Sequence, residues 1–276
     1  MTQDDFKRFL PDDLRTYMSQ EKEKDYVLID VRQPAEYQDG HIPGALLIPL
    51  GEMERRLFEL PSDRDLVFYC RSGGRSAAAA TLAVDAEVTE KSVAHLEGGM
   101  LGWDGHTLTG YPRIQIFDPA AALPDLLKAA IDLEKGAWRF YSEVVSKHPN
   151  APFTPVFKDL SFAEIGHARV VYRFWKHSVP DAPSFEALYD GLTGDVLEGG
   201  IDVSAAIAKI ETLDDPPCMG LLEWAMHIEQ SAYDLYRNTA ERAANAEAKE
   251  AFLTIAQAEK AHMRSLVKAL SVCGPR

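Results

Sequence analysis

The feature that most constrains this chain of 276 residues is a short motif that its second half contains twice. Glu164-Ile-Gly-His167 recurs 95 positions later as Glu259-Lys-Ala-His262, and the same shift carries Glu134 onto Glu229. Apolar residues flank each glutamate at spacings of three, four and seven, which is the pattern of the buried stripe of an amphipathic helix. The second half is therefore predicted to be an internal repeat of two helices.

Four glutamates in the buried apolar stripes of one helical bundle are energetically unfavourable without a positive partner. Each buried carboxylate is costly if unpaired, and the four repel one another. Two divalent cations would neutralise them, and each Glu-x-x-His places a carboxylate and an imidazole on one helical face as two ligands for one ion. The predicted metal ligands are Glu134, Glu164, His167, Glu229, Glu259 and His262. The alternative is a pair of homologous helices whose buried polar residues form hydrogen bonds without metal.

Four long helical patterns are predicted in this half, at about residues 119–147, 155–177, 215–244 and 247–272. A long connection, residues 178–214, with short helices at about 185–189 and 205–213, separates the two hairpins. This arrangement favours an all-α, ferritin-like four-helix bundle over residues 118–276. We expect the boundary with the first half near residues 113–118, where Asp118 would cap the first helix and Pro119 would occupy its first turn.

The first half, residues 1–115, alternates apolar β-rich runs with helix-like segments. Strands are predicted at 27–31, 46–48, 66–69 and 92–96, and helices at 11–19, 52–60 and 76–86. This alternation is typical of an α/β domain with a mainly parallel sheet and flanking helices.

The chemical centre of the first half is the loop that begins at Cys70. A buried strand leads into it, and an alanine-rich helix follows. Glycines let backbone amides turn inward, and the helix start adds further N–H groups. These features lower the pKa of the Cys70 thiol and form a cradle for an anion. The predicted anion-binding residues are Arg71, Ser72, Gly73, Gly74, Arg75 and Ser76. The alternative is that Cys70 is only a small core residue.

The first half resembles a single-domain rhodanese, a sulfurtransferase. The resemblance rests on the residues 28–32, Glu36-Tyr37, the turn 40–45, the Cys70 loop and the residues 96–103. It implies that Cys70 takes a sulfane sulfur from thiosulfate or a persulfide and passes it to a thiol or other nucleophilic acceptor. The Cys-x4-Arg spacing is one residue shorter than that of related phosphatases and arsenate reductases, which favours sulfur transfer. Asp30 and His41 are expected to have structural roles.

The second half resembles the rubrerythrin and ferritin-like di-iron family. The resemblance implies two iron ions bridged or chelated by Glu164 and Glu259, with manganese or zinc as alternatives, and a peroxidase or oxidase reaction with peroxide or oxygen. The chain has no CxxC motif of a rubredoxin module, so the electron donor is expected to be external. Met226 lies where a seventh ligand would fit, so six ligands are expected. Tyr141 and Tyr236 are interpreted as core aromatic residues with a buried hydroxyl, and a redox role is the alternative. Analogy with related bundles suggests a homodimer.

Composition excludes several other classes. The formal net charge of −14 argues against nucleic acid as a partner. The chain has no apolar run of 18 residues, and residues 1–8 lack a signal-peptide core, so we expect a cytoplasmic protein without a membrane partner. Cys218 and Cys273 are expected to be separate thiols. The alternative is that they lie close together, because antiparallel packing of the third and fourth helices would bring both to one end of the bundle.

Together these patterns predict a fused enzyme for sulfur handling and oxidative-stress defence. The alternatives are a sulfur-sensing or iron-binding module without sustained turnover, and a structural protein with vestigial sites.

Overall fold

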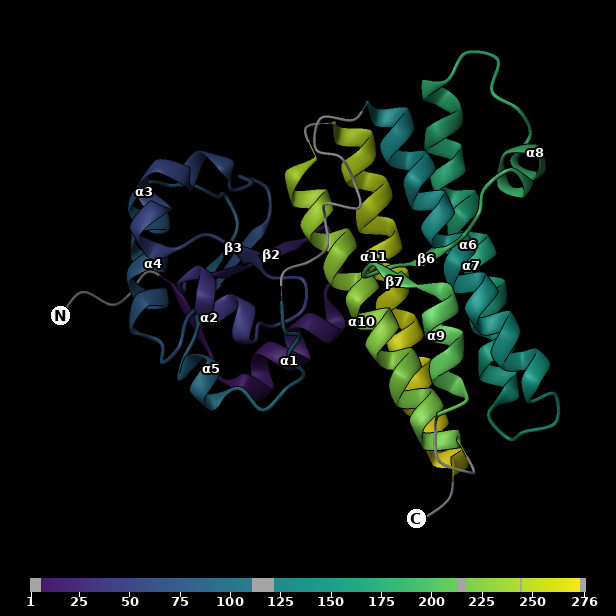
Figure 1. The fold of residues 1–276 in the computed structure, drawn as a ribbon. Helices are drawn as coiled ribbons and strands as arrows, with labels where there is room; N and C mark the ends of the chain where they lie inside the picture. Colours follow the sequence, from purple (N-terminus) through teal and green to yellow (C-terminus); the bar gives the residue numbers. More distant parts are fainter. Residues whose placement is uncertain (1–5, 111–121, 213–216, 244, 274–276) are drawn as a thin grey trace. The chain divides into compact units, whose positions relative to one another are not determined.

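The computed structural model describes residues 6–110, 122–212, 217–243 and 245–273. The chain divides into two compact units, Met1–Tyr111 and Pro112–Arg276, which are described separately below (Figure 1). The expected boundary at 113–118 and the Asp118 cap lie outside the described residues. Within the described ranges, no helix has the length and apolar character needed to cross a membrane.

A five-stranded parallel sheet forms the centre of the first unit (Figure 1). Its strands, in spatial order, are β1 (Lys7–Phe9), β5 (Val93–Leu96), β4 (Asp65–Tyr69), β2 (Tyr26–Asp30) and β3 (Leu46–Leu47). All five residues of β2 are buried, as expected for a central parallel strand that is covered on both faces. Parallel pairing brings the carboxyl ends of the strands to one edge of the sheet, and Cys70 lies there, directly after β4.

Helices cover both faces of this sheet. They are α1 (Pro11–Gln20), α2 (Pro34–Asp39), α3 (Met53–Arg56), α4 (Gly74–Asp85) and α5 (Gly99–Gly102), and 3-10 turns at Leu50–Glu52 and Leu57–Glu59 flank α3. One core contains α4 and Met53, and the other contains Leu14 of α1 and Tyr37 of α2. The α/β prediction with a parallel sheet is confirmed.

The helical segment expected at 52–60 is present but irregular. Residues 50–59 form a 3-10 turn, the four-residue helix α3 and a second 3-10 turn. Within this segment only Met53 is buried, and Phe58 is 84% exposed, so no continuous apolar stripe supports a longer helix. The edge strand β1 and the helix α2 were not predicted.

Four long helices build the second unit, and they confirm the predicted helical bundle. They are α6 (Leu123–Lys147), α7 (Thr154–Ser178), α10 (Cys218–Arg242) and α11 (Ala246–Ala269), followed by a 3-10 turn at Leu270–Cys273. The helix α6 packs against α7, α10 packs against α11, and α7 contacts α11. The predicted helix starts at 119 and 215 lie outside the described residues.

The core of this unit consists of two hydrophobic clusters along the bundle. One contains Leu127 and Ile131 of α6, and the other contains Phe140 and Val144 of the same helix. Glu134 lies in sequence between these two pairs, and the other repeat glutamates occupy the same interval on their own helices. The carboxylates therefore form a polar layer between two apolar ones.

The connection between α7 and α10 has structure of its own. It contains α8 (Phe185–Asp190), the antiparallel hairpin of β6 (Val196–Leu197) and β7 (Ile201–Asp202), and α9 (Val203–Ile210). The two short helices were predicted, but the hairpin was not. Strand β6 packs against α6, and the hairpin crosses the bundle near mid-length (Figure 1).

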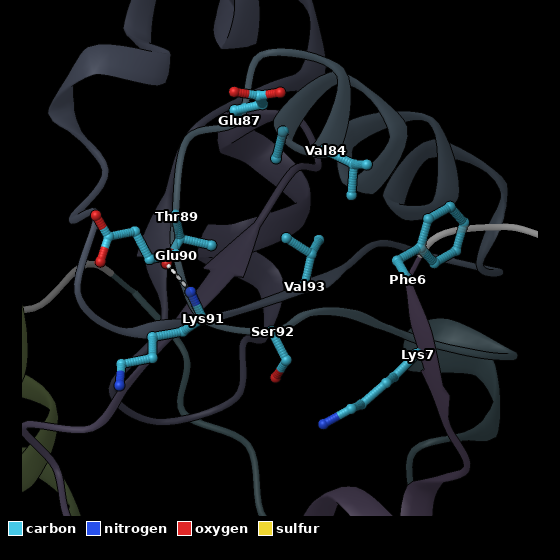
Figure 2. Close-up of a pocket in the computed structure, with 10 residues that line it drawn as sticks. Phe6, Lys7, Val84, Glu87, Thr89, Glu90, Lys91, Ser92 and Val93 are labelled. Carbon is cyan, nitrogen blue, oxygen red and sulfur yellow. Dashed lines mark hydrogen bonds between the residues drawn. The ribbon is translucent and has the colours of Figure 1, made fainter.

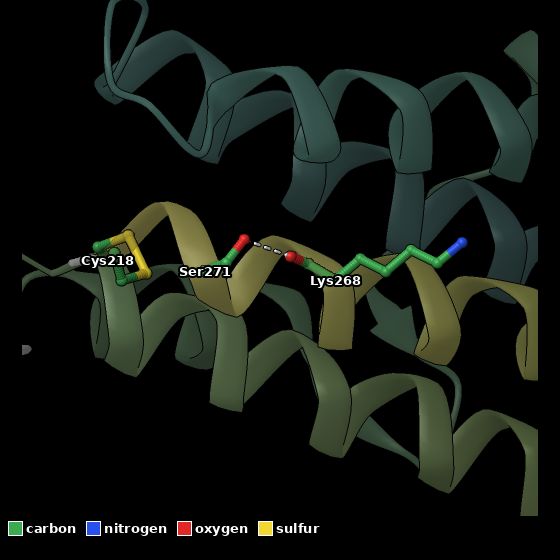
Figure 3. Close-up of a disulfide and its surroundings, with 4 residues drawn as sticks. Cys218, Lys268 and Ser271 are labelled. Atoms are coloured by element: carbon green, nitrogen blue, oxygen red, sulfur yellow. Dashed lines mark hydrogen bonds between the residues drawn. A yellow bond between two sulfur atoms is a disulfide. The ribbon is translucent and has the colours of Figure 1, made fainter. Parts of the chain in front are cut away.

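The expectation that Cys218 and Cys273 are separate thiols was wrong. The two sulfurs form a disulfide with a Cα–Cα distance of 5.5 Å (Figure 3). Cys218 begins α10 and Cys273 ends the turn after α11, so the antiparallel packing of these helices brings both residues to one end of the bundle. The disulfide thus closes the end of the second hairpin.

Candidate functional sites

The first candidate site is the loop between β4 and α4. Cys70 is buried, and the backbone N–H of Gly73 donates a hydrogen bond to its Sγ at 3.1 Å. Gly73 has φ of +99°, a left-handed conformation that favours glycine, and it precedes the first residue of α4. Ser76 lies in the first turn of α4, where its Oγ donates to the Gly73 carbonyl at 3.0 Å. The Gly73 amide thus points at the sulfur, and Ser76 ties the first turn of α4 to the loop.

The same contacts determine the ionisation of the thiol. Burial raises the pKa of Cys70, but hydrogen bonds from the Ser76 side chain and from the amides of Ser76, Ser72 and Gly73 outweigh it. The pKa of Cys70 is therefore lower than that of an ordinary cysteine, which favours the nucleophilic thiolate.

The two arginines of the loop differ. Arg71 is exposed, whereas Arg75 pairs with Glu36 of α2 through two hydrogen bonds of 2.7 Å. The bond from Arg75 lowers the pKa of Glu36 to about 2. Much of the positive charge of Arg75 is thus neutralised inside the protein, so backbone amides contribute more to the anion cradle than the sequence indicated.

A second segment supports the loop. The amide of Met100 donates to the Cys70 carbonyl at 2.8 Å, and that of Leu101 donates to the Arg71 carbonyl at 2.9 Å. A Cβ atom at Gly99, which has φ of +54°, would lie 2.3 Å from the Cys70 carbonyl oxygen. Glycine is therefore required for this close approach.

Asp30 and His41 both have internal partners. The carboxylate of Asp30 accepts hydrogen bonds from Arg32 at 2.6–2.9 Å. His41 is buried and stacks on Tyr37 with ring centroids 3.8 Å apart. These contacts support the surroundings of the loop.

A surface pocket of about 750 Å³ lies elsewhere in the first unit (Figure 2). It is lined by Phe6 and Lys7, by Ser92 and Val93, and by the last residues of α4 with the segment that follows it. These residues lie at the amino-terminal edge of the parallel sheet, whereas Cys70 follows the carboxyl end of β4. The pocket is therefore separate from the sulfur site.

The second candidate site lies in the polar layer of the bundle. Glu134, Glu164, Glu229 and Glu259 are at most 2% exposed, and His262 is 8% exposed. They come from α6, α7, α10 and α11, one glutamate from each helix, with His167 on α7 and His262 on α11. The structure brings all six predicted ligand residues together.

Their atoms form two overlapping sets. His167 Nδ1 lies 3.2 Å from Glu134, 3.1 Å from Glu164 and 3.3 Å from Glu259. His262 Nδ1 lies 2.9 Å from Glu229, 3.5 Å from Glu164 and 3.2 Å from Glu259. Each imidazole thus has one carboxylate of its own, and Glu164 and Glu259 face both.

The charges of this layer are strongly coupled. Burial raises the pKa of Glu134 to about 8, against the opposing effect of His167. Burial lowers the pKa of His262, but Glu229 and Glu259 outweigh it and raise that pKa to about 12. Burial would raise the pKa of Glu259, yet Glu229 and the two imidazoles hold it well below its usual range. Burial of these carboxylates thus favours either a proton or a positive partner in this layer.

Sequence reasoning missed one residue of this layer. Glu198, in the turn between β6 and β7, is 2% exposed, and one of its oxygens lies within 4.8 Å of oxygens of Glu134 and Glu164. Burial raises its pKa well above the usual value. Glu198 belongs to neither repeat, so helical periodicity carries no signal for it.

The residues of the layer fit a metal pair. Oε1 of Glu198 is buried without a hydrogen-bond partner, and Oε2 of Glu134 and Oε1 of Glu259 both lie against the same nitrogen, His167 Nδ1, at 3.2 and 3.3 Å. Carboxylate oxygens and imidazole nitrogens are a donor set that iron, manganese and zinc all accept. Two divalent cations would bind these buried oxygens together with the two imidazoles.

Comparison with known proteins gives two family matches. Residues 10–106 match the rhodanese-like domain, and residues 220–276 match rubrerythrin. The rubrerythrin match contains Glu229, Glu259 and His262, and the 95-residue repeat relates these to Glu134, Glu164 and His167.

Among individual proteins, a sulfurtransferase of Allochromatium vinosum is 41% identical over 85 residues, which are 31% of this chain and 78% of that protein. An HTH-type transcriptional regulator of Mycobacterium tuberculosis is 46% identical over 85 residues, 31% of this chain, and the match spans only 36% of the regulator. A solved rhodanese-like domain protein from Staphylococcus aureus is 27% identical, with a TM-score of 0.34, covering 38% of this chain and 98% of that one. The chain therefore belongs to the rhodanese-like sulfurtransferases, and a rubrerythrin domain is fused behind its rhodanese-like domain.

Proposed function

We propose that the chain is a bifunctional enzyme, with a sulfurtransferase in residues 1–115 and a di-iron oxidoreductase in residues 118–276. The observation that carries the proposal is the pair of donor sets that share Glu164 and Glu259. Two shared carboxylates between two imidazoles are suited to hold two ions side by side. The sulfurtransferase half is supported by the lowered pKa of Cys70 within a loop of inward-facing amides.

The sulfur reaction takes two displacement steps at Cys70. Its thiolate attacks the outer sulfur of thiosulfate, the S–S bond of thiosulfate breaks, and sulfite leaves with the electron pair. Cys70 then carries a persulfide, whose negative terminal sulfur accepts hydrogen bonds from the loop amides. An acceptor thiolate attacks that terminal sulfur, and the Cys70 thiolate leaves. No external oxidant or reductant is needed.

In the bundle, the protein residues hold and shield the proposed iron pair. Glu134 and His167 would hold one ion, Glu229 and His262 the other, and Glu164 and Glu259 both. The bound irons would supply the electrons and Lewis acidity for reducing peroxide or oxygen. The apolar clusters on both sides keep bulk water out, and the tyrosine hydroxyls hydrogen bond to Glu134 and Glu229. An external donor is proposed to return the electrons.

The proposal is tested by separating the two sites. Cys70→Ser is expected to abolish transfer of sulfur from thiosulfate to an acceptor thiol and to leave the bound metal unchanged. Wild-type protein is expected to hold two irons per chain, and its reduced form is expected to be oxidised by peroxide repeatedly when a donor is supplied. Oxidation that stops after one turnover with an excess of donor would favour the iron-sensing alternative. Loss of metal from Cys70→Ser would contradict independent sites.

A further inference from the structure

Glu198 is the buried charged group that the six-ligand interpretation leaves unexplained. Its side chain is 2% exposed, and its Oε1 has no hydrogen-bond partner. A carboxylate in such a position requires a positive partner or a proton. The charged groups around Glu198 are those of the polar layer, because one carboxylate oxygen each of Glu198, Glu134 and Glu164 lies within 4.8 Å of the others.

The connection that carries Glu198 is bound to the outer face of α6. Lys135 Nζ donates to the carbonyls of Tyr189 and Leu192 at 2.7 and 2.8 Å. One turn further, Arg139 donates to the carbonyls of Thr193 and Gly194 at 2.7 and 2.8 Å. These bonds fix the backbone before the hairpin, so the position of Glu198 does not depend on a free loop.

Two glycines allow the hairpin to approach the helices closely. A Cβ atom at Gly136 of α6 would lie 2.2 Å from the carbonyl oxygen of Val196. Gly199 follows Glu198 directly, has φ of +78°, and a Cβ atom there would lie 2.6 Å from the Cβ of Ser231 on α10. The backbone around Glu198 is therefore seated against both α6 and α10.

We propose that Glu198 is a seventh metal ligand, which the connection supplies to the ion held by Glu134 and His167. The inference rests on the proposed metal pair and adds to it a residue from outside the four helices. With Glu198, five residues would hold the ion at Glu134 and His167, whereas four would hold the ion at Glu229 and His262.

The test uses the full chain, Glu198→Gln, and titration with Co²⁺ or Mn²⁺ under anaerobic conditions. Glutamine keeps the size of the side chain and removes its charge. Wild-type protein is expected to bind two ions. In Glu198→Gln the affinity for one of them is expected to fall at least about tenfold, because the loss of a residue that only hydrogen bonds to a ligand already costs that much. Asp190→Asn is the matched control, because Asp190 lies in the same connection and is exposed. Its two affinities are expected to stay at the wild-type values.

Thermal unfolding separates a ligand role from a structural one. Metal-free Glu198→Gln is expected to melt no lower than metal-free wild type, because a buried unpaired carboxylate has been removed. Its gain in melting temperature on adding metal is expected to be smaller. Glu198→Asp, which keeps the charge but shortens its reach, is expected to bind the ion with intermediate affinity.

The outcomes distinguish this inference from the proposed function. Wild-type protein that fails to bind two ions would contradict the proposed metal pair itself. Wild-type protein that binds two ions, while Glu198→Gln binds both with unchanged affinity, would overturn only the seventh ligand. A metal-free Glu198→Gln that melts well below metal-free wild type would also overturn it and assign Glu198 a structural role.

Discussion

Tyr236 of α10 donates a hydrogen bond to Oε1 of Glu134 on α6, with 2.6 Å between the oxygens. The repeat contains an equivalent contact, in which Tyr141 of α6 donates a hydrogen bond to Oε1 of Glu229 on α10. Burial raises the pKa of both tyrosines well above the usual value, so both hydroxyls remain protonated donors. Each hairpin thus orients the lone glutamate of the other, a role that the interpretation of these tyrosines as core aromatics did not include.

Tyr236→Phe is expected to weaken both the fold and the metal site. It leaves Oε1 of buried Glu134 without its donor, which costs about 1–3 kcal/mol in the free energy of unfolding. Loss of an orienting contact is also expected to lower the affinity for one ion about 10-fold or more. Urea unfolding and metal titration measure the two effects. Tyr172→Phe is the control, since that hydroxyl bonds a carbonyl at the surface. Equal behaviour of the two variants would contradict the orienting role.

The fold was largely predictable because its signals are local. The repeat glutamates stand in helical stripes that continue for several turns, and the buried runs before Cys70 and at β2 are rich in β-branched and aromatic residues. The strand β1 was not predicted because it lacks an apolar run. It has three residues, of which Lys7 and Arg8 are charged and exposed. Its place in the sheet depends on pairing with β5, which is a long-range contact.

The candidate sites were predictable to the extent that periodicity defines them. The six predicted ligands on the helices follow from spacing alone, but Glu198 reaches the layer from a connection whose path depends on tertiary contacts with α6. The pairing of Arg75 with Glu36 joins residues 39 positions apart, so the sequence indicated a free cation where the structure has an ion pair. The disulfide was missed although antiparallel helices would bring Cys218 and Cys273 to one end of the bundle, because three cysteines without a CxxC motif favoured separate thiols.

Ser76→Ala is expected to shift the reactivity of Cys70 to higher pH. The hydroxyl of Ser76 helps to lower the pKa of the thiol, so its loss raises that pKa. Because the thiolate is the nucleophile, the rate of alkylation rises as pH rises through the pKa. The midpoint is expected below the ordinary cysteine value in wild type and higher in Ser76→Ala. Iodoacetamide labelling of the Cys70 peptide, measured by mass spectrometry from pH 5 to 10, reports it.

Ser72→Ala is the matched control for that experiment. Ser72 acts on the sulfur through its backbone amide, which alanine retains. Its pH midpoint is therefore expected to stay at the wild-type value. A midpoint that moves as far in Ser72→Ala as in Ser76→Ala would show that the hydroxyl of Ser76 does not set the thiol pKa.

Reduction of the Cys218–Cys273 disulfide is expected to destabilise the bundle. The bond closes a loop of 55 positions, and the loss of such a constraint costs about 2–4 kcal/mol. A reducing agent is expected to lower the melting temperature of wild-type protein and to have no such effect on Cys218→Ser, which melts lower from the start. Mass spectrometry of the alkylated, unreduced protein checks that the bond forms. Full labelling of all three cysteines in oxidised, unfolded protein would disprove it.

Two helical glycines give a matched pair of substitutions. A Cβ atom at Gly136 would meet the carbonyl oxygen of Val196 at 2.2 Å, whereas nothing lies within 4 Å of one at Gly166 of α7. Alanine favours a helix over glycine by about 1 kcal/mol, so Gly166→Ala is expected to raise the free energy of unfolding. Gly136→Ala forces β6 away from α6 and is expected to lower that free energy despite the same propensity gain.

The Gly136→Ala variant also tests whether the β6–β7 hairpin positions Glu198 in the polar layer. If the close contact at Gly136 positions Glu198, then Gly136→Ala reduces the affinity for one of two Co²⁺ ions, as Glu198→Gln does. The double variant is then expected to bind no more weakly than the weaker single variant, because both changes remove the same interaction. Independent, additive losses in the metal titration would show that Gly136 acts on the fold alone.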